Sequence, residues 1–229
     1  MAPALAKRDE EELNLSEQAY LKIKHKILQN IYPGGFQVLE DTLSEDLGMS
    51  RTPLKEALVR LANEGLIEIL PRRGMRILPL TAIDIAEIYE VLSPLELLAA
   101  RLLAERQNNI DSVKALQAEV DQMKRALTAD DLDAWAAADE RFHRTLVDET
   151  GNTRLATAAK NLLDQSQRFR MFTLRLREKP VRSTRNHEAL VTSIRKHDAA
   201  KAVSEHAMHR ANWHEYMTEL MKKFGIRHI

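Results

Sequence analysis

Several residue types are missing or scarce in this chain of 229 residues. It has no cysteine, only seven glycines and seven prolines, and 5% aromatic residues. The absence of cysteine excludes disulfides, thiolate zinc ligands and cysteine nucleophiles. No run of about 18 apolar residues occurs, which argues against a transmembrane helix. The acidic first 15 residues lack the apolar core of a signal peptide. We therefore expect a cytoplasmic protein that does not enter a membrane.

The chain also lacks net charge, with 34 basic and 34 acidic residues. A neutral total argues at first sight against a nucleic-acid partner. With 44% hydrophobic and 30% charged residues, the composition is that of a folded globular protein. Any DNA contact must therefore come from local placement of basic residues.

Residues 16–79 have the pattern of a winged helix-turn-helix, and residues 1–15 are expected to be a flexible tail. Helices are predicted at 16–29, at 41–47 and from Thr52-Pro53 to Gly65, where Thr52 is the expected cap and Pro53 the first helical residue. Two β-favouring stretches, 66–69 and 75–78, follow and are joined by a turn at 71–74.

Basic residues gather at two points of this domain. Arg51, Thr52 and Lys55 lie at the start of the predicted third helix, the end that meets base edges in helix-turn-helix proteins. Arg72, Arg73 and Arg76 lie in or beside the predicted wing, where they could contact the DNA backbone. The structural alternative, a solvated charged face, explains isolated charges better than it explains this combination.

The stretch 50–58 (Ser-Arg-Thr-Pro-Leu-Lys-Glu-Ala-Leu) and the turn 71–74 (Pro-Arg-Arg-Gly) resemble the DNA-binding domain of GntR-type transcriptional regulators. The resemblance implies that Arg51, Thr52 and Lys55 contact DNA, with Arg73 and Gly74 at the wing tip. Lys55 stands where the family usually has arginine, which weakens bidentate base readout. Asp41 lies where some members have a DNA-contacting basic residue, so that contact is not expected here.

Residues 80–229 are predicted to form an all-α bundle of about six helices, because glycine and proline become rare and apolar residues recur at helical spacing. A short linker near 79–82 precedes it. Thr81 and Asp84 have the spacing of a capping box. The expected helices are 82–107, 110–128, 131–149, 153–178, 184–196 and 198–224.

Asp139 and His143 are four residues apart on one predicted helix and therefore share a face. Such a pair can bind a divalent ion, although a polar pair on the helix surface is the commoner explanation. If the helices carrying His187 and His209 pack against this face, one carboxylate and three imidazoles converge. That donor set suits Zn²⁺ or Ni²⁺ better than Mg²⁺ or Ca²⁺.

Asp139, His143, Gly151-Asn152, His187, Asp198 and His209 together resemble the FCD ligand-sensing domain of the FadR-type branch of these regulators. Metal-binding members of the branch use an Asp and three His at these positions, which implies that Asp139, His143, His187 and His209 ligate a metal. Members that bind acyl-CoA lack the set. The resemblance leaves surface or supporting roles for three other histidines, His197, His206 and His214.

One further departure concerns the effector. The family usually has an arginine where this chain has Leu92. If that arginine helps to hold an anionic effector, this protein either recognises its ligand differently or uses another cation. Arg168, Arg170 and Arg175, on a predicted inner helix, are the candidates, although a solvated face explains them equally well.

The resemblance implies a homodimeric, DNA-binding transcriptional regulator, most often a repressor in this family, rather than an enzyme. Its two winged domains would read a palindromic double-stranded DNA operator, and a small organic acid bound at the metal would modulate that binding. A metalloenzyme, or a structural or storage metal protein, is the alternative. Neither alternative explains the winged domain.

Overall fold

The computed structural model describes residues 14–226 and 228–229. The chain divides into two compact units, one comprising residues up to Leu80 together with His228–Ile229, and the other Thr81–Arg227. The predicted flexible tail at 1–15 lies outside the described residues except for its last two. None of the described helices is both long and apolar enough to cross a membrane.

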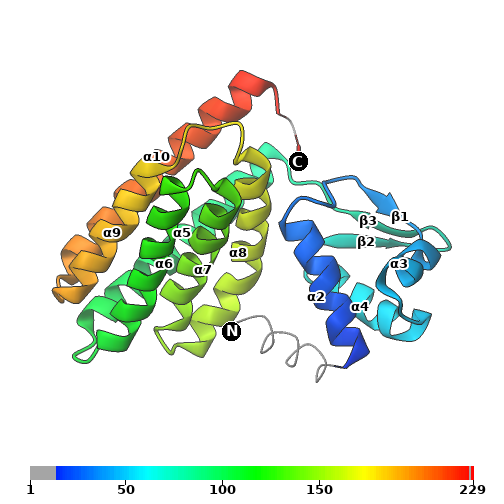
Figure 1. Cartoon of the computed structure of the whole chain (residues 1–229), viewed down its shortest axis with the longest axis horizontal. Helices are drawn as coiled ribbons and strands as arrows, with labels where there is room; N and C mark the ends of the chain where they lie inside the picture. Colours follow the sequence, from blue (N-terminus) through cyan, green and yellow to red (C-terminus); the bar gives the residue numbers. More distant parts are fainter. Residues whose placement is uncertain (1–13, 227) are drawn as a thin grey trace. The chain divides into compact units, whose positions relative to one another are not determined.

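The first unit contains three helices and a small sheet within its described part (Figure 1). The helices are α2 (Leu15–Leu28), α3 (Glu40–Leu47) and α4 (Arg51–Asn63), and the strands are β1 (Gln37–Val38), β2 (Ile67–Leu70) and β3 (Gly74–Ile77). The strands are antiparallel in the order β1-β3-β2. This is the predicted winged helix-turn-helix.

Helix α4 packs into this unit through one apolar face. Leu54, Leu58 and Leu61 recur at helical spacing and are at most 1% exposed. Gly48 ends α3 in the left-handed conformation, with a φ of 63°, which turns the chain toward α4. Helix α4 begins at Arg51 after the N-cap residue Ser50, so the expected cap at Thr52 is wrong: Thr52 already lies within the first turn.

The wing is a tight turn between β2 and β3. The Arg73 N–H donates to the Leu70 carbonyl over 2.9 Å. Gly74 has a φ of +81°, and a Cβ there would lie 2.0 Å from the Val38 carbonyl oxygen. Only glycine fits this position, because strand β1 passes directly against it. The sequence analysis did not predict β1.

The described residues of the second unit form an all-α bundle of six helices, the number expected. Helix α7 lies between α6 and α8, while α10 packs on α5 and α9 (Figure 1). The helices are α5 (Ala82–Glu105), α6 (Ile110–Thr128), α7 (Leu132–Asp148), α8 (Thr153–Thr173), α9 (Val181–Arg195) and α10 (Ala199–Phe224). The fold class is thus mainly α, as predicted.

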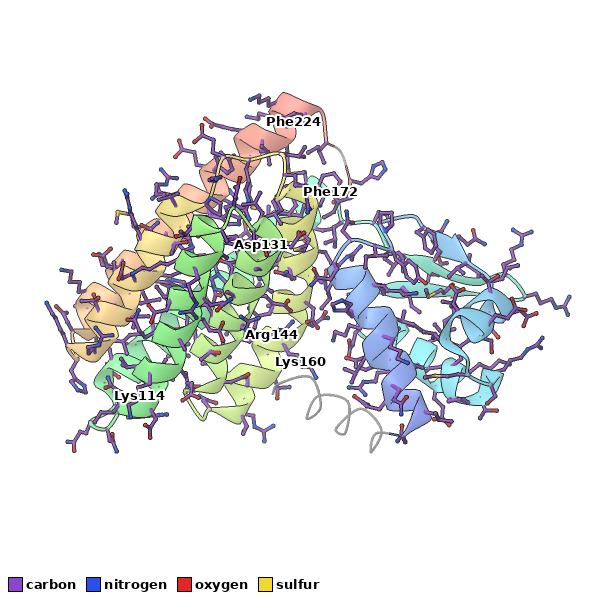
Figure 2. All side chains as sticks on the ribbon, in the orientation of Figure 1. Lys114, Asp131, Arg144, Lys160, Phe172 and Phe224 are labelled. Atoms are coloured by element: carbon purple, nitrogen blue, oxygen red, sulfur yellow. The ribbon has the colours of Figure 1, made fainter. Side chains whose placement is uncertain are left out.

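Side-chain caps fix the ends of several of these helices. Asp131 caps α7 and Asn152 caps α8, each through its side-chain oxygen. Figure 2 shows Asp131 at the start of α7 and Arg144 toward its end. Helix α8 stops at Thr173, five residues before the predicted end. The segment that follows brings Arg177 to the site described next.

Candidate metal centre and DNA-binding surface

Helix α7 presents the first two residues of the predicted metal site. Asp139 and His143 are buried, at 2% and 1% exposed, and His143 Nε2 lies 3.8 Å from Asp139 Oδ1. The hydrophobic face that carries them also buries Trp135 and Phe142 against the rest of the bundle. The helix therefore holds a carboxylate and an imidazole in the buried interior of the bundle.

Two other helices bring the remaining predicted ligands to the same place. His187 of α9 lies with its Nε2 3.0 Å from Asp139 Oδ1. The rings of His187 and His209, the latter from α10, have centroids 4.8 Å apart. The structure thus brings together residues that are up to 70 positions apart in the sequence (139 to 209).

The geometry of these side chains fits a metal ion. One nitrogen from each of His143, His187 and His209 lies within 4.8 Å of the other two. Nitrogens bound to one zinc ion are roughly 3–4 Å apart, since each Zn–N bond is about 2.0–2.1 Å long. If the three nitrogens moved slightly closer together, they could bind one ion. Asp139, which lies against the His143 and His187 rings, could then supply an oxygen ligand.

The electrostatics also favour ligation. Burial opposes ionisation of Asp139, but the His187 hydrogen bond and the neighbouring positive groups hold its pKa well below the ordinary value. Burial, reinforced by the charge of Arg210, lowers the pKa of His143 to about 3. Burial likewise lowers the pKa of His209. The carboxylate is thus ionised and these two imidazoles are neutral, which are the forms that bind metals.

A buried acid supports His143 from the side opposite the cluster. Glu96 of α5 is fully buried, and its Oε1 lies 2.9 Å from His143 Nδ1. Since Nδ1 faces Glu96, Nε2 is the nitrogen that faces Asp139. Arg210 Nη2 also lies 2.9 Å from Nδ1, within hydrogen-bond distance, so Glu96 and Arg210 together position this ring. The Arg210 charge holds the pKa of Glu96 well below its ordinary value despite burial.

The three histidines left outside the predicted ligand set differ in environment. His206 is 1% exposed, and its Nε2 lies 3.4 Å from Glu96 Oε2, which gives it a supporting position. His197 is exposed and contacts the Ala104 carbonyl. His214 is exposed. Neither His197 nor His214 belongs to the cluster.

The three predicted effector-binding arginines lie in different places. Arg170 lines the pocket at the cluster, with its Nε 3.4 Å from Asp139 Oδ2. Arg168 is buried on α8 but does not line that pocket. Arg175 is exposed and pairs with the exposed Asp133 over 2.7 Å. Of the three, only Arg170 is positioned beside the candidate metal ligands.

Sequence reasoning missed two arginines that the structure places at the cluster, Arg177 and Arg210. Arg210 forms an ion pair with Glu96 and lies over the Tyr89 ring. It therefore supplies, from α10, a cation beside the α5 segment in which Leu92 replaces the arginine usual in the family. The i, i+4 spacing of His206 and Arg210, both of which contact Glu96, was the available signal.

The predicted DNA-contacting residues of α4 lie on its surface. Arg51, Thr52 and Lys55 are all exposed at the N-terminal end of the helix. Arg51 Nη2 lies 2.8 Å from Asp41 Oδ1 of α3. Asp41 therefore contacts the first residue of α4, a contact that the sequence did not indicate.

The basic residues of the wing are not equivalent. Arg72 and Arg73 are exposed at the turn, and Arg72 has a positive φ of 63°. Arg76 is paired with Glu68 on the neighbouring strand. Gly74 is buried against β1. Among the described residues neither Arg72 nor Arg73 has an acidic partner, so these two cations are better placed for a phosphate than Arg76.

Known proteins resemble this chain over most of its length. An HTH-type transcriptional regulator of the TAR-I ttuE-ttuC' intergenic region of Agrobacterium vitis is 46% identical over 131 residues, covering 56% of this chain and 77% of the relative. The gluconate operon transcriptional repressor of Bacillus subtilis is 29% identical over 187 residues, covering 78% and 75%. The E. coli McbR/YncC structure shares the fold, with a TM-score of 0.80 at 18% identity, covering 93% and 99%.

Two family descriptions match separate parts of the sequence. Residues 15–77 match the bacterial regulatory proteins of the gntR family. Residues 87–212, more than half of the chain, match the FCD domain. The two matches fall on the winged unit and on the helical unit respectively. The chain therefore belongs to the GntR family of bacterial transcriptional regulators, in the branch whose ligand-sensing part is an FCD domain, and not to a family of enzymes.

Proposed function

We propose that this regulator is a metal-containing repressor whose affinity for its operator changes when a small organic acid binds in the helical unit. It would act in the cytoplasm as a homodimer on a palindromic operator, with one winged unit for each half-site. Relatives described as a gluconate operon repressor and a probable D-xylose utilization operon repressor support the assignment as a repressor.

The observation that carries this proposal is the convergence of Asp139, His143, His187 and His209 in the core of the helical unit. Buried ionisable groups are costly, and a bundle needing only stability would hold apolar residues there. Bound by these four side chains, Zn²⁺ or Ni²⁺ would supply a Lewis-acidic site for a carboxylate.

The exposed groups of the winged unit support the DNA-binding half of the proposal. Arg51, Thr52 and Lys55 would approach base edges, as they lie at the first turn of α4. Arg72 and Arg73 would approach phosphates. A ligand changes operator binding only to the extent that it favours one arrangement of the dimer over another.

The test combines metal analysis with DNA binding. Purified protein should contain close to one zinc or nickel ion per chain, and His187→Ala should weaken metal binding by more than about tenfold. The matched control is His214→Ala, which alters an exposed histidine outside the cluster. Metal content would be measured by mass spectrometry and operator affinity by fluorescence anisotropy, with and without carboxylic acids.

Full metal retention by His187→Ala would remove His187 from the site. Operator affinity that no carboxylic acid changes, in metal-loaded protein, would contradict the regulatory part of the proposal. Unchanged operator binding by Arg51→Ala would contradict the role given to α4.

A further inference from the structure

A cavity leads from the surface of the helical unit to the candidate metal ligands. Its outer part has a volume of about 270 Å³ and lies between the start of α9 and the middle of α10. Its inner part, of about 10 Å³, lies among Asp139, His143 and Arg170. The two parts share four lining residues, namely Arg177, Ser183, His209 and Trp213.

The sizes of the two parts assign different occupants to them. The inner part holds no more than about one water-sized particle, which suits a metal ion but no organic molecule. The outer part is smaller than the roughly 300–1,000 Å³ of pockets for drug-sized ligands. An organic acid would therefore be small, and would lie mostly in the outer part with one end reaching inward.

The walls carry an unusual number of buried donors without acceptors. Within the described part of the chain, no side chain or backbone group accepts from Nη1 and Nη2 of Arg170, from Nε and Nη2 of Arg177, or from Trp213 Nε1. Arg170 itself is only 4% exposed. Such donors are rare in native proteins and indicate that the site binds a group with several acceptor atoms.

These donors fall at two separate points. Arg170 lies at the inner end, beside Asp139. Arg177 lies at the junction of the inner and outer parts, with its guanidinium carbon 5.3 Å from the Trp135 ring centre and 4.9 Å from that of Trp213. These cation–π contacts help to position the guanidinium. Its Nε and Nη2, which have no acceptor within the described residues, form one edge that could make a bidentate hydrogen bond to a carboxylate.

The charges of the cluster point to a dianion. Three arginines (Arg170, Arg177 and Arg210) face two acids (Asp139 and Glu96), which leaves one excess positive charge. A divalent metal ion would raise the excess to three. A ligand with one carboxylate lowers it to two, whereas a ligand with two carboxylates lowers it to one. Because excess charge in a buried site is unfavourable, the second carboxylate adds to affinity.

From these contacts we infer that the effector is a small dicarboxylate, with one carboxylate at the metal and Arg170 and the other held by Arg177 and Trp213 Nε1. This inference rests on the proposed function and specifies its ligand. It also gives Arg177 a specificity role, because a monocarboxylate would leave the Arg177 edge without a partner.

The test compares each dicarboxylate with its monoamide, which has nearly the same shape but one charge fewer. Zinc-loaded, full-length protein would be titrated by calorimetry with succinate, succinamate, malate and malamate. At least one diacid should bind more than about tenfold tighter than its monoamide, as expected for loss of a charge-assisted bidentate contact. Equal affinity for acid and monoamide in both pairs would overturn the inference.

Variants locate the second carboxylate. Arg177→Gln should bind the diacid about as weakly as wild type binds the monoamide, with little change in monoamide affinity. Trp213→Phe keeps the ring that stacks on Arg177 but removes Nε1, so it should weaken diacid binding several-fold. The control is Arg185→Gln, an exposed arginine on α9 outside the cavity lining, which should keep the full preference.

The outcomes separate the two levels of the proposal. If no acid or amide binds to metal-loaded protein, the proposed effector site fails, and the dianion inference with it. If acids and amides bind equally and both change operator affinity, only the dianion inference fails. An unaltered preference in a correctly folded Arg177→Gln protein would contradict the role given to Arg177.

Discussion

An ion pair between Arg51 and Asp41 joins the start of α4 to α3. Both side chains are largely exposed, at 67% and 64%. Exposed ion pairs add little to stability, so the consequence of this pair is functional. The carboxylate fixes the direction of the guanidinium at the start of α4, and it also repels nearby phosphates. Asp41 should therefore favour base contacts by Arg51 over indiscriminate phosphate contacts.

We predict that Asp41→Asn binds random duplex DNA more tightly but discriminates its operator less well. Arg51→Ala should lose about 1–3 kcal/mol of operator affinity. Anisotropy titrations over a series of salt concentrations would give both affinities and their salt slopes. Asp46→Asn is the charge-matched control, because Asp46 is exposed on the same helix. If Asp41→Asn and Asp46→Asn distinguish operator from random DNA equally well, the ion pair between Asp41 and Arg51 has no role in specificity.

The residues that converge around Asp139 were predictable to different degrees. The i, i+4 spacing placed Asp139 and His143 on one face. His187 and His209 were candidates only if their helices packed against that face, which the resemblance to a family implied but no local pattern shows. Glu96 was missed as a partner of this cluster because nothing local in α5 shows which of its residues will face a histidine from α7. Such contacts depend on how helices pack, which a single sequence encodes only indirectly.

The ends of helices were predictable where local sequence signals mark them, and less so where tertiary contacts determine where a helix stops. The cap at Asp198 and the left-handed Gly225 set the ends of α10 within one residue of expectation. The helical pattern continues past Thr173, yet α8 ends there. Beyond it, Arg175 pairs with Asp133 and Arg177 stacks on two tryptophans. Strand β1 has only two residues and no periodicity to detect.

The capping box at the start of α5 gives a test at the level of one helix. The Thr81 N–H donates to Asp84 Oδ2 over 2.8 Å, and the Asp84 N–H donates to Thr81 Oγ1 over 3.2 Å. Thr81→Ala should destabilise the protein by about 1 kcal/mol in urea unfolding, because the Asp84 N–H at the start of the helix loses its acceptor, Thr81 Oγ1. Thr128→Ala, an exposed threonine at the end of α6, should cost less than about 0.5 kcal/mol. Equal losses of unfolding free energy in the two variants would show that the capping box does not stabilise the protein.

At the level of the whole molecule, the four candidate ligands connect helices α7, α9 and α10, all within the helical unit. The winged unit has a separate apolar core formed by residues of α2, α3, α4 and the sheet. A bound ion would therefore act as a cross-link in one unit only. Without the ion, Asp139 is held by Arg170, His143 and His187, through contacts weaker than metal bonds.

Removal of the metal should accordingly loosen one unit and spare the other. Zinc in about 1,000-fold excess over its dissociation constant would stabilise the helical unit by about 4 kcal/mol, and chelation would abolish this gain. Hydrogen exchange should then accelerate in α7, α9 and α10, while amides of α4, β2 and β3 keep their protection, since local opening follows local stability. Readdition of zinc should restore the original rates. Equal acceleration in both units, or none in the helical unit, would show that the four side chains do not hold a stabilising ion.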